Sequence, residues 1–366
     1  MIIGVPKEIK TAEFRVGVTP SGAEELKRDG HTVLIESGAG LGSGFADEEY
    51  LNADADIVDR STVFGKAELI VKVKEPPPSE YDLLRDGQAL FTYLHLAANS
   101  ELTEVLLKKR VAGFAYETLE KDGALPLLAP MSAIAGRMAP LVGAYYLQKF
   151  HGGNGVLPTG TVGVKPANAV IIGAGVVGTN AARVCLGLET DTVVINRGTE
   201  RLSRIDELFG GRVKTLVLTR HHVREAIKDA DLVIGALLVP GGRTPVVITR
   251  EMLGIMRKGA VIVDVSVDQG GCVETARPTT HEDPIFEVDG IIHYMVANMP
   301  GAYPRTSTVA LTDATLPFVR LLAGAGIGEA IREHAVMRGS LNTYDGRITN
   351  RSLAESLGME FAPPER

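Results

Sequence analysis

The stretch Val170-Ile171-Ile172-Gly173-Ala174-Gly175-Val176-Val177-Gly178 joins an apolar strand to an Ala-rich helix expected at 179–186. Its glycines have GxGxxG spacing: Gly173 permits a tight turn, Gly175 lets a pyrophosphate approach the backbone, and Gly178 lets the helix pack closely on the strand. The N-terminus of the helix then offers free N–H groups to the phosphates. Because strand, glycines and helix occur in this order, the stretch predicts a Rossmann-like dinucleotide-binding unit.

The next strand, expected at 192–195, ends where an NAD site usually places an acid that binds the adenosine ribose. This chain instead has Asn196-Arg197-Gly198-Thr199-Glu200-Arg201. With no carboxylate to repel a 2′-phosphate, Arg197 and Arg201 could bind it, since a planar fork of donors suits phosphate. Alternatively, both arginines are a solvated surface pair and NAD binds through Asn196. The cofactor predicted is therefore NAD(H) or NADP(H), with acceptance of NADP(H) indicated by Asn196 and Arg197.

Short β-branched or aromatic segments alternate with helical segments twice along the chain. Strands are expected at 2–5, 32–35, 69–73, 89–93 and 113–116, and then at 170–172, 192–195, 215–218, 232–234, 261–263 and 292–296. A helix at 21–29 is expected to begin at Ser21 as N-cap, with Glu24 at the spacing of a capping box. Strands and helices in alternation predict parallel pairing through right-handed crossovers. The fold class is therefore α/β, with two doubly wound parallel sheets.

Two segments are expected to connect these halves. An amphipathic helix at 131–150 is followed by a Gly/Pro-rich stretch at 152–166, and the pattern becomes helical again at 307–337. We expect the last helix to return to the first sheet. This gives a substrate domain of residues 1–128 and 305–366 and a Rossmann dinucleotide-binding domain of residues 129–304, and a chain that crosses twice leaves a cleft between its domains.

Composition excludes several classes of protein. The 366 residues suggest about two domains, and 45% hydrophobic with 23% charged residues is typical of a soluble globular protein. The net charge of −7 argues against a nucleic-acid partner, and no apolar run approaches the ~20 residues of a membrane span. The segment Met1 to Glu8 lacks a targeting signal, so we expect a cytoplasmic location. Cys185 and Cys272 cannot form a disulfide framework, and no metal-ligand spacing is evident.

Candidate polar residues follow the strands, at the sheet edge where open α/β folds bind ligands. Lys72 and Lys74 close one strand, where alternation puts both on one face without deciding between them. His95 closes the next strand and, taken alone, could equally be a structural histidine. Asp268 comes just past a buried strand of the second half. An acid there would cost free energy if desolvated and unpaired, so Asp268 should have a partner or a role.

Longer motifs resemble those of the alanine dehydrogenase family, which also includes the NAD-binding subunit of proton-translocating transhydrogenase. The resemblance covers nearly the whole chain and rests on Gly4-Val5-Pro6-Lys7-Glu8 with Arg15, Lys74-Glu75-Pro76, Tyr93-Leu94-His95-Leu96, Pro130-Met131-Ser132 with Gly136-Arg137, Asp268-Gln269-Gly270-Gly271-Cys272 and Val296-Ala297-Asn298-Met299-Pro300. The family commonly has an acid at the positions of Ala133 and Asn196, where this chain departs from it.

The resemblance implies a role for each matching residue. Arg15 and Lys74 bind the substrate carboxylate, His95 acts as acid and base near the reacting carbon, and Asp268 supports that chemistry across the cleft. The family's cofactor contacts correspond to Ser132, Leu238, Val267, Asn298 and Met299. These roles suit the chemistry, because arginine can hold a carboxylate at two points, lysine adds a mobile charge and imidazole exchanges protons near neutral pH.

The reaction implied is the reversible oxidative deamination of L-alanine to pyruvate and ammonia. Hydride passes from the alanine Cα to the nicotinamide C4, water activated by His95 adds to the imine, and the carbinolamine collapses. Two alternatives stay open: another small L-amino acid as substrate, or a non-catalytic transhydrogenase-type subunit, in which the four polar residues would have no assigned role. The resemblance also implies a homo-oligomer, often a hexamer, with the helix at 131–150 as a candidate interface.

Overall fold

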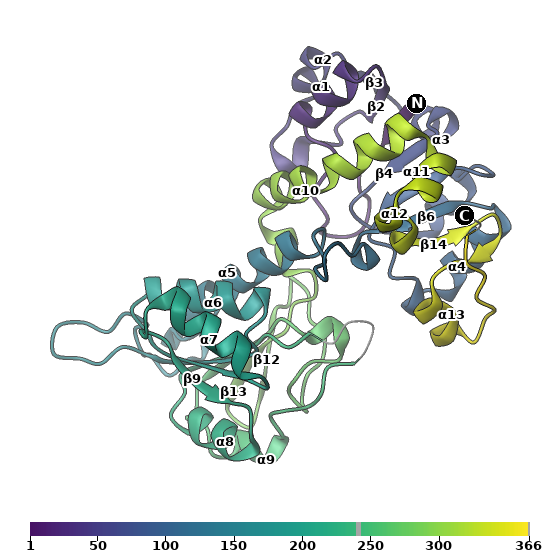
Figure 1. Ribbon diagram of the computed structural model, residues 1–366. Helices are drawn as coiled ribbons and strands as arrows, with labels where there is room; N and C mark the ends of the chain where they lie inside the picture. The colour runs from purple at the N-terminus through teal and green to yellow at the C-terminus, as the bar shows by residue number, and fades with distance from the viewer. Residues whose placement is uncertain (239–242, 365–366) are drawn as a thin grey trace. The chain divides into compact units, whose positions relative to one another are not determined.

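The computed structural model describes residues 1–238 and 243–364 (Figure 1). Contacts between Cα atoms divide the chain into two compact units. The first unit contains Met1–Met131 and Gly301–Arg366, and the second contains Ser132–Pro300. Each unit is built on its own sheet, and each is described separately below.

The first unit has an eight-stranded sheet in the order β15-β14-β6-β5-β4-β1-β2-β3. Its strands are β1 (Ile2–Val5), β2 (Thr32–Glu36), β3 (Asp56–Val58), β4 (Leu69–Val71), β5 (Ala89–Thr92), β6 (Ala112–Ala115), β14 (Leu341–Tyr344) and β15 (Arg347–Ile348). Strands β1 to β6 run parallel, whereas β14 is antiparallel to β6 and β15 to β14. The chain order reverses between the neighbours β1 and β4. Their carboxyl ends therefore form a topological switch point, the usual ligand-binding edge of such sheets.

Helices cover the first sheet. They are α1 (Pro20–Arg28), α2 (Asp47–Asn52), α3 (Arg60–Lys66), α4 (Ser100–Lys108), α10 (Pro304–Ala325), α11 (Ile327–Glu333), α12 (Ala335–Ser340) and α13 (Arg351–Leu357), with 3-10 turns η1 (Leu41–Ser43), η2 (Pro78–Leu83), η3 (Leu96–Ala98) and η4 (Tyr116–Thr118). The core between sheet and helices contains side chains such as Phe64, Ile70, Leu90 and Leu106. Burial of such apolar side chains is what holds these short strands and helices in place.

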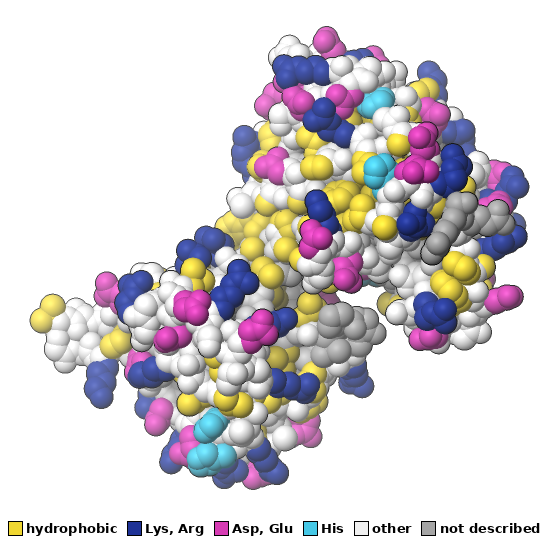
Figure 2. All heavy atoms as spheres, in the orientation of Figure 1, with side chains coloured by type: hydrophobic (Ala, Val, Ile, Leu, Met, Phe, Trp, Pro, Cys, Tyr) yellow, Lys and Arg dark blue, Asp and Glu magenta, His cyan; other side chains and the backbone are white. Residues whose placement is uncertain are grey.

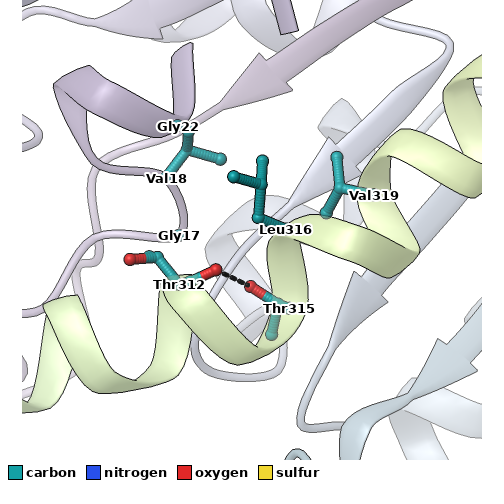
Figure 3. Close-up of a pocket in the computed structure, with 7 residues that line it drawn as sticks. All are labelled: Gly17, Val18, Gly22, Thr312, Thr315, Leu316 and Val319. Carbon is teal, nitrogen blue, oxygen red and sulfur yellow. Dashed lines mark hydrogen bonds between the residues drawn. The ribbon is translucent and has the colours of Figure 1, made fainter. Parts of the chain in front are cut away.

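The long helix α10 packs against α1 in the first unit, as Figure 1 shows. A cavity of about 10 Å³ remains beneath it, lined by Gly17, Val18 and Gly22 on one side and by α10 residues on the other (Figure 3). The hydroxyl of Thr315 turns back to donate to the Thr312 carbonyl at 3.3 Å instead of pointing into the cavity. A space of this size could hold at most one water, and its mainly apolar lining offers that water few partners.

The second unit has a seven-stranded sheet in the order β12-β13-β11-β10-β7-β8-β9. Its strands are β7 (Asn168–Ile172), β8 (Asp191–Asn196), β9 (Lys214–Val217), β10 (Leu232–Gly235), β11 (Val261–Asp264), β12 (Ile285–Val288) and β13 (Ile291–Tyr294). All are parallel to their neighbours except β12, which is antiparallel to β13. The order of this sheet reverses between β7 and β10, so its switch point lies at the glycine-rich turn that follows β7.

The helices of the second unit are α6 (Val176–Gly187), α7 (Thr199–Phe209), α8 (Arg220–Lys228) and α9 (Arg250–Leu253), with 3-10 turns η5 (Lys149–His151) and η6 (Val267–Gln269). Two further elements, α5 (Ala129–Tyr146) and η7 (Met299–Ala302), lie at the ends of this unit and extend into residues of the first. The core contains Ile172, Ile195, Val233, Ile262 and Met252. The predicted α/β class with two doubly wound, mainly parallel sheets is confirmed.

Several predicted helix boundaries are wrong. Helix α1 begins at Pro20 and its N-cap is Thr19, whose hydroxyl accepts the Gly22 N–H at 3.2 Å, so Ser21 is already inside the first turn. Proline suits that first helical position because it has no N–H to leave unsatisfied. The helix expected at 307–337 is three helices, since α10 ends at Gly326, whose φ of 82° does not continue a helix.

The antiparallel edge strands β12, β14 and β15 and the short β3 were missing from the prediction. They have few consecutive apolar residues, and the partly exposed pattern of β12 gives little periodic signal. Among the described residues, no single helix is long and apolar enough to cross a membrane. Helices α10 and α11 together have the length and composition, but they are bent by 110°.

Candidate functional site

Arg15 lies on the connection between β1 and α1, at the switch point of the first sheet, with only 2% of its surface exposed. Its Nε and Nη2 donate to the two carboxylate oxygens of Glu13 at 2.7 and 2.6 Å, and Nη1 lies 3.0 Å from the Met131 sulfur. Burial opposes ionisation of Glu13, but the hydrogen bonds and charge of Arg15 outweigh it and lower the pKa of Glu13. One edge of the Arg15 guanidinium fork is therefore already bound by a carboxylate of the chain itself.

The two lysines that follow β4 have different environments. Strand β4 ends at Val71, so the strand alternation expected to place Lys72 and Lys74 on one face does not extend to them. The fully buried Lys72 Nζ lies 3.3 Å from a Glu8 oxygen and 3.1 Å from a Glu80 oxygen. Burial opposes its charge, yet the two carboxylates raise the pKa of Lys72. Lys72 is thus a structural cation inside the first unit.

Lys74 differs from Lys72 in its ion pairs. In the described part of the chain, no carboxylate oxygen lies within 4.0 Å of its Nζ. Burial and, next, the positive charge of Arg15 lower the pKa of Lys74. Glu8 holds the turn that carries it, because its Oε1 accepts the backbone N–H groups of Val73 at 2.7 Å and Lys74 at 3.2 Å.

His95 follows β5 and takes a left-handed backbone conformation with φ of 47°. Glu117, on η4 after the neighbouring strand β6, accepts the His95 N–H at 2.7 Å and the Leu94 N–H at 3.2 Å. The imidazole is half exposed and stacks on the Tyr93 ring, with centroids 5.9 Å apart and planes 7° apart. Tyr93 is fixed in turn by its hydroxyl, which donates to the Leu127 carbonyl at 2.7 Å.

These side chains form one cluster in the first unit. Arg15 interacts electrostatically with both Lys74 and the buried phenol of Tyr93, and Tyr93 stacks on His95. The cluster therefore combines two cations with an accessible imidazole at the carboxyl edge of β1, β4 and β5. Such an arrangement can bind a carboxylate and exchange a proton beside it.

The glycine-rich turn of the second unit leaves a cradle at the start of α6. A Cβ on Gly173, whose φ is 115°, would lie 2.3 Å from the Ala236 carbonyl, and one on Gly178 would lie 1.9 Å from the Gly173 carbonyl. Gly175 differs, because the nearest atom to its Cβ position is the Arg201 Nη1 at 3.8 Å. As N-cap of α6 it brings no capping side chain. The open backbone and helix N-terminus fit a pyrophosphate group.

Asn196 ties this turn to the end of β8. Its Oδ1 accepts the Ala174 N–H at 3.2 Å and its Nδ2 donates to the Gly198 carbonyl at 3.1 Å. Arg197 and Arg201 are both exposed, and within the described ranges no carboxylate forms an ion pair with either. The start of α7 thus presents two cations that no acid of the described chain neutralises.

Asp268 lies on η6 after β11 and is exposed, so its carboxylate does not carry the cost of desolvation. The buried acid at this strand end is Asp264, the last residue of β11, with no exposed surface. The other predicted cofactor contacts also lie in the second unit: Ser132 and Asn298 are partly buried, Val267 and Met299 are buried, and Leu238 is 52% exposed. The described residues contain no group of three or more His, Cys, Asp or Glu that could hold a metal ion.

Comparison with known proteins gives the family. Residues 4–135 match the model of the N-terminal domain of alanine dehydrogenase/PNT, and residues 139–351 match that of the C-terminal domain. The chain belongs to the alanine dehydrogenase/PNT family. Its relatives in this family include the alanine dehydrogenase of Bacillus subtilis, 48% identical over 100% of this chain and 97% of the relative, and that of Halomonas elongata, 50% identical over 99% and 98%.

Solved structures of the family have the same fold. An L-alanine dehydrogenase is 48% identical and superposes with a TM-score of 0.95, covering 98% of this chain and 99% of the other. A transhydrogenase from Sinorhizobium meliloti is 25% identical, with a TM-score of 0.83 over 96% and 100%. The resemblance found in the sequence motifs is therefore confirmed for the family and for the fold.

The sequence did not single out Glu8, Glu13, Glu117 or Asp264 as site residues. All four are acids that bind either a predicted site residue or the turn that carries one. Glu8 belonged to a motif that resembled the family, but its contact with Lys74 joins residues far apart in the chain. The contacts of Glu8 with Lys74 and of Glu117 with His95 form only when neighbouring strand ends pack together.

Proposed function

We propose that this chain is an alanine dehydrogenase, which catalyses the reversible NAD(P)-dependent oxidative deamination of L-alanine to pyruvate and ammonia. The observation that carries the proposal is the cluster of Arg15, Lys74 and His95 at the switch point of the first unit, in a chain of this family. We assign substrate binding to the first unit and nucleotide binding to the second, which contains the glycine-rich cradle.

In the proposed reaction, the chain's own residues bind the carboxylate and move protons. Because Glu13 takes one edge of Arg15, the substrate carboxylate is shared between Arg15 and Lys74. NAD or NADP, when bound, supplies the hydride acceptor for deamination. His95 takes a proton from the water that adds to the substrate imine, and returns a proton to the nitrogen as the carbinolamine releases ammonia. Asp268 stabilises the positive charge of the imine or of the protonated imidazole.

The nucleotide is held by Gly173, Gly175 and Gly178 around the pyrophosphate. Further contacts are assigned to Ser132, Asn196, Leu238, Val267, Asn298 and Met299. The two exposed arginines that follow Asn196 support acceptance of NADP(H), since their guanidinium groups can donate to a 2′-phosphate and no acid stands at the end of β8 itself.

A spectrophotometric assay at 340 nm tests this function. Pyruvate and ammonia are supplied together and separately, in parallel with NADH and with NADPH. We expect oxidation of the nicotinamide only when pyruvate and ammonia are both present, and a fall in turnover of about 10²–10⁴-fold in His95→Ala. No turnover with any small 2-oxo acid would favour the transhydrogenase-type reading, which the similarity to the Sinorhizobium meliloti protein supports. Turnover with another 2-oxo acid but not with pyruvate would instead change the substrate.

We also propose that the chain forms a homo-oligomer, with a hexamer as the family expectation. The segment between α5 and β7 projects from the second unit as an arm, and Figure 2 shows hydrophobic side chains at its tip. Val162 is fully exposed on this arm, Leu157 and Val164 are 60% and 62% exposed, and Phe150 at its base is 97% exposed. Large apolar side chains gathered in this way mark a protein–protein contact. The proposal is tested by measuring the sedimentation coefficients of the wild type and of Val162→Asp and comparing their oligomeric states. A monomeric wild type contradicts the proposal.

A further inference from the structure

One carboxylate closes the turn that carries Val267 and Asp268 in the second unit. The Oδ1 of Asp264 accepts the Ser266 N–H at 2.9 Å, and its Oδ2 accepts the Cys272 N–H at 2.7 Å. Asp264 therefore joins the first and last residues of the segment 266–272. Both hydrogen bonds run from backbone donors to the carboxyl oxygens of one side chain.

The surrounding chain is shaped to admit this carboxylate. A Cβ on Gly235 would lie 2.5 Å from Asp264 Oδ1, and a Cβ on Gly271 would lie 2.8 Å from Oδ2. Any larger residue at either position would displace the acid. Two glycines from separate segments thus make room for the side chain of Asp264.

The surroundings of the Asp264 carboxylate are unusual for an acid. Across the described ranges, no Lys, Arg or His nitrogen lies within ion-pair distance of its carboxylate, although it is completely buried. Burial raises the pKa of Asp264, and the Ser266 and Cys272 N–H groups oppose that rise. A buried acid without a cation is costly to the fold. The two N–H donors offset part of that cost, because an apolar residue at this position would leave both of them without an acceptor.

Other hydrogen bonds also hold the segment, because the Thr244 N–H donates to the Gln269 carbonyl and the Val247 and Ile248 N–H groups donate to the Cys272 carbonyl. The Ser266 hydroxyl donates to the Leu237 carbonyl at 2.7 Å, which ties the start of the segment to the chain after β10. Within the segment, the N–H groups of Gln269 and Gly271 both donate to the Ser266 carbonyl. Ser266 thus takes part in most hydrogen bonds at the start of the turn, and the Asp264 carboxylate joins its N–H to that of Cys272.

We infer that Asp264 is a positioning residue, which fixes the turn that presents Val267 and Asp268 at the carboxyl edge of β11. The inference rests on the proposed function for the part that concerns turnover. Asp264 acts through the backbone N–H groups at the two ends of the turn, together with the side chains of Ser266 and Cys272. An asparagine cannot replace it, because its amide nitrogen would face one of those two N–H donors.

Asp264→Asn tests the inference, with Asp231→Asn as its matched control. Asp231 is 1% exposed and accepts the Asn168 N–H at 2.9 Å, but it lies immediately before β10, at the opposite edge of the same sheet. Each variant is measured for its melting temperature, for turnover with pyruvate and ammonia, and for amide hydrogen exchange of a peptide spanning 265–273. Both substitutions replace a buried carboxyl group with an amide, and Asp231 also has an ion pair with Arg257 at 3.4 Å, so a general effect of losing a buried acid on folding appears in the control as well.

We expect Asp264→Asn to increase exchange in that peptide while leaving exchange in the rest of the sheet unchanged. Turnover is expected to fall by up to about 10²-fold, the cost of a misplaced site, with an unchanged KM for pyruvate and a raised KM for NADH. Asp231→Asn should change neither the peptide's exchange nor turnover. Unchanged exchange of the 265–273 peptide in Asp264→Asn would overturn the inference. The inference would also fail if both variants lost turnover in proportion to the fall in their melting temperatures. If the wild type itself lacks turnover, the proposed function fails, and exchange of the 265–273 peptide still decides the role of Asp264.

Discussion

Glu117 accepts the backbone N–H of His95 at 2.7 Å, and the same carboxylate oxygen lies 3.9 Å from the His95 Nδ1. One acid therefore binds the backbone of this residue and lies close to its imidazole. His95 has φ of 47°, a conformation that costs free energy in a residue with a Cβ. The hydrogen bonds from the Leu94 and His95 N–H groups to Glu117 offset that cost and fix the backbone that carries the ring.

Glu117→Ala should lower turnover with pyruvate and ammonia by about 10-fold to 10²-fold, because the turn that carries His95 loses its acceptor. Glu117→Gln should retain more turnover, since its amide oxygen can still accept the His95 N–H. Glu120→Ala is the control, because Glu120 is exposed and close in sequence. Full turnover in Glu117→Ala would contradict the positioning role.

Glu13→Gln should destabilise the fold at neutral pH by about 3–5 kcal/mol, the cost of removing one partner of a buried ion pair. The pKa of Glu13 is lowered in the folded chain, so the carboxylate contributes stability above its unfolded pKa, and this contribution is lost as pH falls through the folded pKa. Urea unfolding gives the free energy of unfolding of wild type and variant at neutral pH and below about pH 4. The difference between the two free energies should be smaller in acid. Glu25→Gln, at a more exposed ion pair, should change stability little at either pH.

The KM for pyruvate should rise with pH on the alkaline side. Burial and the charge of Arg15 lower the pKa of Lys74, so its cationic form is lost at a lower pH than that of an exposed lysine. Lys74→Arg keeps the positive charge throughout this range and should hold the KM constant. The KM for pyruvate of wild type and Lys74→Arg is obtained from steady-state rates measured at several alkaline pH values. The same rise in KM in Lys74→Arg would show that another group is responsible.

Arg201→Ala should raise the KM for NADPH about tenfold, as expected for a lost hydrogen bond to a charged group, and leave the KM for NADH unchanged. Its guanidinium lies 3.8 Å from the Cβ position of Gly175, beside the cradle for the nucleotide phosphates. Arg204→Ala, at an exposed position on the same helix, provides the control. An equal change for both nucleotides would argue against recognition of a 2′-phosphate.

Lys109→Met should lower the free energy of unfolding by about 2 kcal/mol. The Lys109 ammonium donates to the carbonyls of Tyr81 at 2.7 Å, Asp82 at 3.2 Å and Leu84 at 2.7 Å, which closes the end of η2. Hydrogen bonds from a charged donor are worth about 1.5–3 kcal/mol, and loss of this donor leaves the carbonyls unsatisfied. Lys108→Met removes a neighbouring exposed lysine and should have little effect in denaturant unfolding. Equal stability of the two variants would contradict this assignment.

The sequence by itself determined the fold class, the glycine-rich turn and the family. These depend on local patterns, because strand periodicity, GxGxxG spacing and contiguous motifs are all read along the chain. The central parallel strands could be predicted for the same reason. The edge strands and the breaks at Gly326 could not, since their local signal is weak and their pairing depends on the rest of the sheet.

Only the tertiary structure decided which charged residues are buried and which groups they contact. It showed that Lys72 forms ion pairs with Glu8 and Glu80, whereas Lys74 does not. It also showed that the buried acid at the end of β11 is Asp264 and that Asp268 is exposed. The physical reason is that the cost of a buried charge depends on which distant donors and counterions surround it. The carboxylates around Lys72 come from other segments of the first unit, whereas the N–H donors to Asp264 come from the turn after β11, and both sets take their places only when the chain is folded.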